Sequence, residues 1–320
     1  MVNERHAQSA VRRVGLLVGR ERSFPDALIR EVNARNAGVV AEYVKLGGAR
    51  MAEPCPYDVI VDRISHDVTC YQPYLKNAVL SGTVVINNPF WRIADDKFFG
   101  TALAVKLGIA CPKTVVLPSK DYSPDTTAES LSNLIFPLDW EAIVAYTGLP
   151  AILKPHWGGG WKHIYRVDSL EALIACYNQT GTLTMMVQEM IDWQHYVRCI
   201  CIGQENVLVT MWDPRRPHFE RYRPDDPPLD PALQERVISD AIKLNRALGY
   251  DMNTVEFAIR DGVPYAIDFM NSAPDFDITS LQPVYFQWVV NAMADLVIAR
   301  ALRSNSQPPA YRWDAFLSGM

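Results

Sequence analysis

The sequence lacks the features of membrane, secreted and cysteine-dependent proteins. None of its apolar runs approaches the roughly 18 residues that a membrane span needs. The first residues, MVNERHAQSAVRR, are polar and lack the apolar stretch of a signal peptide. The six cysteines are scattered and form no CxxC pair, so a cysteine-based metal site is not indicated. We therefore expect a reduced, cytoplasmic protein without a membrane partner.

Excess basic charge is also missing. The chain of 320 residues carries a formal net charge of −5, and this argues against broad binding to nucleic acid. Hydrophobic residues make up 49% and charged residues 21%, an ordinary globular composition. With roughly 100–200 residues per domain, the length predicts two or three domains. Internal repeats and low-complexity tracts are absent.

The common nucleotide motifs are absent as well, although one glycine-rich stretch is prominent. Residues 151–167 read AILKPHWGGGWKHIYRV, in which an apolar run ends at Lys154 and three glycines follow. Neither a P-loop nor a G-x-G-x-x-G pattern fits. Glycines allow backbone N–H groups to approach phosphate oxygens closely, so a phosphate here would bind under a hairpin loop. The alternative is a flexible hairpin with an exposed lysine.

Hydrophobic periodicity changes along the chain. Between residues 12 and 90, apolar strands alternate with helices, and this is typical of a parallel α/β sheet. Later, MMVQEMI, YVRCICIG and NVLVTMW read as consecutive antiparallel strands, and Asp261-Gly262 predicts a hairpin turn. A long apolar helix is expected around 282–303. Helix starts are expected at Ser23, at Asp95 or Asp96, and at Asp139, Asp168 and Asp230.

Four segments, in this order, resemble the ATP-grasp superfamily, in particular its glutathione-synthetase-like carboxylate–amine ligases. They are VVINNPFWRIADDKFFGTALAVKLGIACPKTVVLP, AILKPHWGGGWKHIYRV, MVQEMIDWQHYVRCICIG and NTVEFAIRDGVPYAIDFMNSAP. The resemblance runs from about residue 84 to 300 and implies α/β and α+β architecture. It implies an N-terminal parallel α/β domain at 1–92, an ATP-grasp lobe with the glycine-rich loop at 93–187, and a lobe with a metal-binding hairpin at 188–320.

The resemblance also implies the residues of a nucleotide site. Two lysines would neutralise the phosphates, the glycine loop would close over them, and backbone groups of a hinge would read the adenine. Asp192 or His195 would reach the ribose, and Arg198 would be a catalytic residue near the γ-phosphate and the acyl group. The implied ATP-binding residues are Lys97, Lys154, Gly158, Gly159, Gly160, Gln188, Glu189, Ile191 and Asp192.

Lys97 carries an argument of its own. It follows Asp96 in the predicted first turn of a helix, where the positive end of the helix dipole disfavours a cation. An anionic partner would explain this placement, whereas the alternative is an ordinary surface residue.

The predicted hairpin carries the candidate Mg²⁺ ligands Glu256, Asp268 and Asn271. Mg²⁺ prefers oxygen ligands, and an unpaired carboxylate within an apolar strand would be costly. The alternative is that both charges point to solvent. A plain two-residue turn would pair Glu256 with Ile267, so the two carboxylates can share a metal only if the loop is longer or the ladder bulges once. We predict that irregularity.

The metal motif departs from the pattern it resembles. The family has an acidic residue and an asparagine separated by one residue, whereas two residues separate Asp268 from Asn271. Either a local kink restores the geometry or Asn271 is not a ligand. Asp275 and Asp277 are candidate substitutes.

Arginines mark the candidate substrate side. The segment 211–228, MWDPRRPHFERYRPDDPP, includes Arg221 and Arg223, whose guanidinium groups suit carboxylates or phosphates. The alternative is a solvated turn neutralised by its own aspartates. Arg20 or Arg22, just after the first strand, is a second candidate for holding a carboxylate.

The leading hypothesis is an ATP- and Mg²⁺-dependent ligase that joins a small-molecule carboxylate to an amine, an amino acid included, through an acyl phosphate. Charge stabilisation of phosphoryl transfer needs the lysines and the metal but no Ser-His-Asp or Cys-His constellation. The alternatives are an ATP-dependent small-molecule kinase and a nucleotide-binding protein without turnover. The oligomeric state is left open, a homo-oligomer included.

Overall fold

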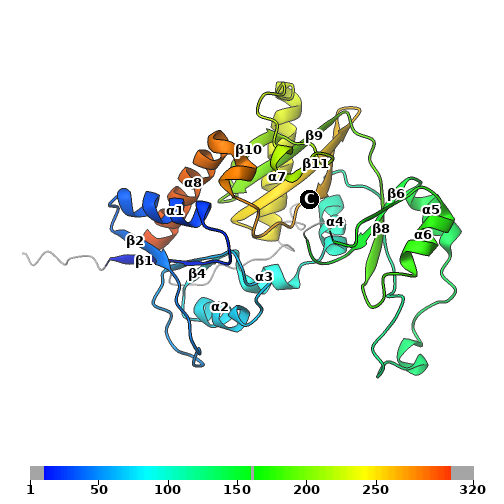
Figure 1. Cartoon of the computed structure of the whole chain (residues 1–320), viewed down its shortest axis with the longest axis horizontal. Helices are drawn as coiled ribbons and strands as arrows, with labels where there is room; N and C mark the ends of the chain where they lie inside the picture. Colours follow the sequence, from blue (N-terminus) through cyan, green and yellow to red (C-terminus); the bar gives the residue numbers. More distant parts are fainter. Residues whose placement is uncertain (1–10, 160–161, 304–320) are drawn as a thin grey trace, which may run out of the picture. The chain divides into compact units, whose positions relative to one another are not determined.

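The structure, a computed structural model, describes residues 11–159 and 162–303 (Figure 1). By its internal contacts the chain divides into two compact units. The first unit contains residues 11–94, 198–254 and 272–303, and the second contains 95–197 and 255–271. None of the described helices is long and apolar enough to cross a membrane.

A parallel sheet forms the first part of the first unit. Its strands are β1 (Arg12–Leu17), β2 (Val39–Tyr43), β3 (Val59–Asp62) and β4 (Val84–Ile86), in the order β2-β1-β3-β4. All three pairings are parallel, which confirms the α/β pattern read from the sequence. The connecting helices are α1 (Ser23–Ala34), α2 (Tyr71–Leu80) and α3 (Pro89–Ala94).

Two long helices complete the first unit. Helix α8 (Ile278–Leu302) packs with α1 against the parallel sheet, and α2 lies on the other face in Figure 1. The helix is interrupted at Gln282, whose φ is 63°, because Pro283 cannot continue the hydrogen-bond ladder. Helix α7 (Pro231–Leu248) packs on β10 (Asn206–Met211). As predicted, α7 is capped by Asp230 and ends at Gly249 in the left-handed conformation.

The second unit is built on an antiparallel sheet with the order β5-β8-β6-β7. Figure 1 shows α5 and α6 together on one face of this sheet, where they cover an apolar core that includes Leu153, Leu173 and Val187. The elements are α4 (Lys97–Lys106), β5 (Thr114–Val116), the 3-10 turn η1 (Ala128–Leu131), α5 (Trp140–Thr147), β6 (Ala151–Pro155), β7 (Tyr165–Val167), α6 (Leu170–Tyr177) and β8 (Met185–Glu189).

A third sheet has the order β10-β9-β11-β12, and the division between the units falls within two of its strands. The strands not yet given are β9 (His195–Ile202), β11 (Met252–Arg260) and β12 (Val263–Asp268). Arg260 pairs with Val263, so Asp261-Gly262 forms the predicted two-residue turn.

Three local predictions were wrong. Ser23 is not a cap; its hydroxyl donates to Asp277 instead. Helix α6 is capped by Ser169, because Asp168 is turned towards Arg166. Strand β8 pairs with β5 and β6 and not with β9, since the connection 190–194 carries the chain from one sheet to another. The caps Asp96 and Asp139 are confirmed.

Candidate nucleotide and metal site

Lys154 is a buried cation at the end of β6. Lys154 belongs to the strand that leads into the glycine loop, and only 7% of the residue is exposed. Burial lowers the pKa of its ammonium group to about 8, and repulsion from Lys97 adds to this effect. The carboxylates of Asp268 and Glu256 act in the opposite direction but do not compensate. The surroundings of Lys154 therefore favour additional negative charge.

Lys97 lies close to Lys154 because the backbone holds α4 against the end of β6. The Lys97 N–H donates to the His156 carbonyl over 2.8 Å. The Lys97 ammonium group donates to Asp268 over 2.9 Å, so a carboxylate of the protein is its anionic partner. The unfavourable position of a cation in the first turn is thus offset by a specific ion pair.

The hairpin β11–β12 brings the two carboxylates opposite each other. Phe257 pairs with Ala266, whereas the next residue, Glu256, pairs with Asp268. One residue of β12, Ile267, is therefore bulged, and the predicted irregularity is confirmed. The bulge places Glu256 and Asp268 on one face of the hairpin. Asn271 follows three residues after Asp268 and is half-buried.

The carboxylate pair fits Mg²⁺ chemically, because two carboxylate ligands complemented by phosphate oxygens and water are its usual environment. The pair lies in the same unit as Lys97 and Lys154, and both carboxylates and Lys97 act on the charge of Lys154. The described residues contain no cluster of three or more histidine, cysteine, aspartate or glutamate side chains around one point.

Two contacts in this region were missed from the sequence. The Tyr196 hydroxyl donates to Glu256 Oε2 over 2.9 Å, and Arg260 Nη1 lies 3.1 Å from Glu189 Oε1. Tyr196 and Arg198 are two residues apart on β9, so their side chains lie on the same face of the strand. This spacing from a predicted site residue is the sequence feature that could have identified Tyr196. Nothing in the sequence marked Arg260 as more than a residue before a turn.

The hinge residues lie where β8 ends. Gln188 is buried and donates to the Thr114 hydroxyl. The Glu189 N–H donates to the Lys113 carbonyl, and its carboxylate accepts from the Lys113 N–H, so this residue is fixed on both sides. Ile191 is buried, whereas Asp192 and His195 are exposed.

The glycine stretch connects the antiparallel strands β6 and β7, as predicted. Gly158 has a φ of 99°, a backbone conformation that residues other than glycine rarely adopt. No atom lies within 4 Å of the position that a Cβ atom would occupy there. Gly159 is likewise uncrowded. Gly160 and Trp161 lie outside the described residues.

In the first unit, Arg198 is surrounded by aromatic rings. Its guanidinium lies 5.3 Å from the centre of the Trp212 ring and 6.0 Å from that of Tyr222, and Nη2 donates to the Thr254 hydroxyl. Arg221 lies over the same Trp212 ring at 5.6 Å. Two of the predicted arginines therefore stack on one tryptophan, an arrangement that orients guanidinium groups.

The other arginines of this loop are paired with nearby aspartates. Arg223 donates to Asp226 through Nε and Nη2, and Arg215 donates to both oxygens of Asp213. The bond from Arg215 lowers the pKa of the Asp213 carboxyl. Arg20 is exposed just beyond β1.

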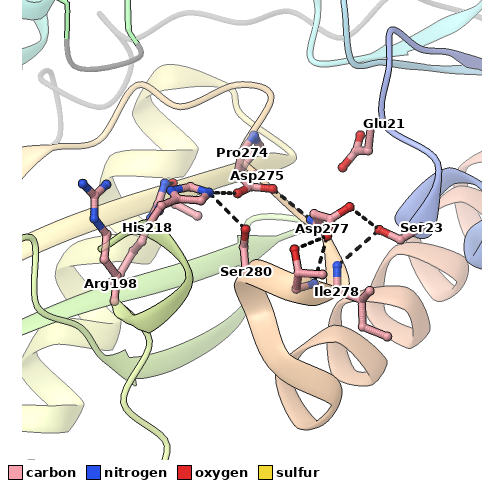
Figure 2. Close-up of polar contacts among 12 residues, drawn as sticks. Glu21, Ser23, Arg198, His218, Pro274, Asp275, Asp277, Ile278 and Ser280 are labelled. Atoms are coloured by element: carbon pink, nitrogen blue, oxygen red, sulfur yellow. Dashed lines mark hydrogen bonds and ion pairs between the residues drawn. The ribbon is translucent and has the colours of Figure 1, made fainter. Parts of the chain in front are cut away.

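Figure 2 shows a polar network that joins this loop to the start of α8 and to the first residue of α1. His218 Nε2 lies 2.7 Å from Asp275 Oδ2 and 3.1 Å from the Ser280 hydroxyl. The Asp277 N–H donates to Asp275, and the Asp277 carboxylate accepts from the Ser23 hydroxyl. Arg198 lies on the His218 side of the network in this view. Asp275 and Asp277, the candidate substitute ligands, are therefore engaged in structural contacts.

Solved structures of ATP-grasp proteins superpose on this chain. The RimK domain ATP-grasp protein of Sphaerobacter thermophilus superposes with a TM-score of 0.63, at 19% identity over 91% of this chain and all of that one. The ATP-grasp ligase PsnB gives a TM-score of 0.62, at 13% identity over 91% of this chain and 98% of that one. The chain has the ATP-grasp fold. The resemblance found in the sequence is thus confirmed for the ATP-grasp architecture.

Sequence comparison finds two relatives that match part of the chain. A D-alanine–D-alanine ligase of Ralstonia nicotianae is 25% identical over 181 residues, which cover 51% of this chain. The aligned part is 54% of that ligase and 11% of a second relative, pyruvate carboxylase 1 of Caenorhabditis elegans, so the matches span about half of the curated relatives or less. No protein-family profile matches the chain.

Proposed function

We propose that the protein is an ATP- and Mg²⁺-dependent carboxylate–amine ligase that acts through an acyl phosphate. The observation that carries this proposal is the group of Lys97, Lys154, Glu256 and Asp268 within one unit of an ATP-grasp fold. Two lysines and two opposed carboxylates form an environment for a metal-bound polyphosphate. The PsnB structure contains Mg and ADP, and the relative from Ralstonia is a ligase by name, which supports the choice of reaction.

In this proposal the nucleotide-binding residues belong to the second unit. Lys154 and Lys97 neutralise phosphate oxygens, and Gly158 and Gly159 belong to the loop above them. The Glu189 N–H is engaged by Lys113, so the adenine is read by the Glu189 carbonyl and by Ile191. Gln188 supports the hinge, and Asp192 or His195 contacts the ribose. Gly160 has the same expected role as its neighbours and lies outside the described residues.

Glu256 and Asp268 would hold Mg²⁺, with Asn271 as the third candidate. The ion, when bound, supplies charge neutralisation for the phosphates during transfer. Lys97 pairs with Asp268 and would hold that carboxylate in position.

The reaction proceeds in two balanced steps. An oxygen of the substrate carboxylate attacks the γ-phosphorus, and ADP leaves with the electrons of the broken bond. The amine then attacks the acyl carbon, phosphate leaves, and the amine loses a proton to give an amide. In this proposal Arg198, whose guanidinium lies over the rings of Trp212 and Tyr222, would stabilise charge on the acyl group. Arg221, Arg223 and Arg20 are the proposed carboxylate contacts of the substrates.

The test is a screen of carboxylic acids and amines for ADP release, with mass spectrometry of the products. Hydroxylamine is included because it traps an acyl phosphate as a hydroxamate. An amide that requires acid, amine and ATP together is the expected result. A stable phosphorylated product formed without any amine would identify a kinase, and nucleotide binding without ADP formation across the panel would contradict turnover. The expected cytoplasmic location is checked by fractionation.

A further inference from the structure

One hydrogen bond connects the metal hairpin to the strand that follows the hinge. The Tyr196 hydroxyl, on β9, donates to Glu256 Oε2 on the neighbouring strand β11 over 2.9 Å. Both residues are buried, with 6% and 7% of their surface exposed. A buried hydrogen bond to a carboxylate is among the stronger ones in proteins, so this contact restrains one oxygen of Glu256 and thereby its orientation.

The two carboxylates of the hairpin have different kinds of partner. Asp268 is paired with the ammonium group of Lys97, which cancels part of its charge. Glu256 receives a neutral hydroxyl from Tyr196, which orients the carboxylate and leaves its negative charge in place. Glu256 also acts electrostatically on Lys154, and the direction of its carboxylate depends on the bond from Tyr196.

Tyr196 is itself held by the surrounding chain. Its ring packs edge-on against Trp193, with the centres 5.4 Å apart. The Gln194 N–H donates to the Ile259 carbonyl, and the Gln194 side chain exchanges two hydrogen bonds with Asp261. The chain is thus fastened to the hairpin two residues before Tyr196, which gives Tyr196 a defined position from which to orient Glu256.

We propose that Tyr196 is a positioning residue that sets the metal affinity of the site by orienting Glu256. The inference rests on the proposed function, since it takes Glu256 as a metal ligand. Partners that orient a ligating carboxylate typically contribute a factor of about 10–100 to metal affinity. The hydroxyl touches neither nucleotide nor substrate in this role, so its removal should weaken metal binding and spare metal-free nucleotide binding.

The experiment uses Tyr196→Phe in the full chain, with Tyr265→Phe as the matched control. Tyr265 lies on the same hairpin, and its hydroxyl accepts from Arg260 and not from a carboxylate. Mn²⁺ binding is measured by electron paramagnetic resonance with AMPPNP, a non-hydrolysable ATP analogue, and AMPPNP binding is measured separately with EDTA. We expect Tyr196→Phe to weaken Mn²⁺ binding about 10–100-fold and to leave AMPPNP binding in EDTA within twofold of the wild type. Tyr265→Phe should match the wild type in both.

Two further variants keep the result interpretable. Tyr196→Met removes the hydroxyl with different packing and should give the same loss, so a fault of folding in one variant does not decide the outcome. In a Glu256→Gln background, Tyr196→Phe should change Mn²⁺ binding less than twofold, because the residue acts through Glu256. Mn²⁺ binding by Tyr196→Phe within twofold of the wild type would overturn the role of Tyr196 alone. A wild-type protein that binds no Mn²⁺ with AMPPNP would overturn the proposed metal site as well.

Discussion

The charged side chains of the second unit and those of the 212–226 loop in the first unit are arranged in opposite ways. In the second unit, Lys154 and Lys97 come from distant segments and are buried or half-buried near two carboxylates. In the loop, Arg215 and Arg216 are both paired with Asp213, two and three residues away, and both are exposed. Charges assembled at such cost in burial indicate a ligand, whereas charges neutralised by sequence neighbours indicate a solvated turn.

The largest effect that tests this contrast is expected from Lys154→Met. Loss of the buried cation removes charge stabilisation during phosphoryl transfer, and turnover should fall by at least about 100-fold. The measurement is ADP release with the acid and amine found in the screen. Lys106→Met, at an exposed position of α4, is the control and should be active. Activity retained by Lys154→Met would remove the glycine loop and its lysine from the mechanism.

The same variant should differ in stability in a pH-dependent manner. The pKa of Lys154 is about 8 in the folded state and 10.5 in the unfolded chain. Below pH 8 the folded protein holds a buried charge, so nucleotide-free Lys154→Met should be more stable than the wild type by on the order of 3 kcal/mol. Between pH 8 and 10.5 the unfolded state binds more protons, the stability of the wild type rises, and the difference should disappear.

Urea unfolding of both proteins at pH 7, 9 and 10.5 measures this difference. Groups that titrate in both proteins contribute equally to the two free energies of unfolding, so their contributions cancel in the difference. A constant difference across the three pH values would mean that Lys154 is not a strained cation in the free protein.

Only part of this arrangement could be predicted from the sequence. Periodicity identified the parallel sheet, and the count of residues between Glu256 and Asp268 required the bulge. Helix caps were less certain: Ser169 and Asp168 are neighbours with the same capping chemistry, and the ion pair with Arg166 decided between them. The bond from Tyr196 to Glu256 joins residues 60 positions apart and depends on sheet order, which local pattern does not specify.

A smaller effect is expected at the hinge. Arg260→Met removes the ion pair with Glu189 and the stacking of the guanidinium on the Tyr265 ring, whose centre is 4.8 Å away. A partly exposed ion pair contributes up to about 1 kcal/mol, so the KM for ATP should rise by up to about fivefold with kcat little changed. Arg260→Lys should recover part of the loss. A fall in kcat at unchanged KM would place Arg260 in the reaction itself.

The smallest effects are expected from the loop. Arg215→Ala loses an exposed pair with Asp213 and should change the melting temperature by less than about 2 °C, with ADP release unchanged. Arg221→Ala, which loses the stack on Trp212, should instead raise the KM of one substrate. If Arg215→Ala and Arg221→Ala have the same substrate KM, Arg221 is not a substrate contact and the contrast drawn here is wrong.

The bulge at Ile267 has a consequence for insertions and deletions in this hairpin. In a regular ladder counted from the Asp261-Gly262 turn, Glu256 would pair with the fifth residue of β12, which is Ile267. Because Ile267 is bulged, Glu256 pairs with Asp268 instead. Removal of one codon, that of Ile267, would bring the following aspartate into that position and keep it opposite Glu256. Insertion of a further codon would move the aspartate out of register. The hairpin should therefore tolerate a deletion at this point better than an insertion, the reverse of what is usual for a surface loop.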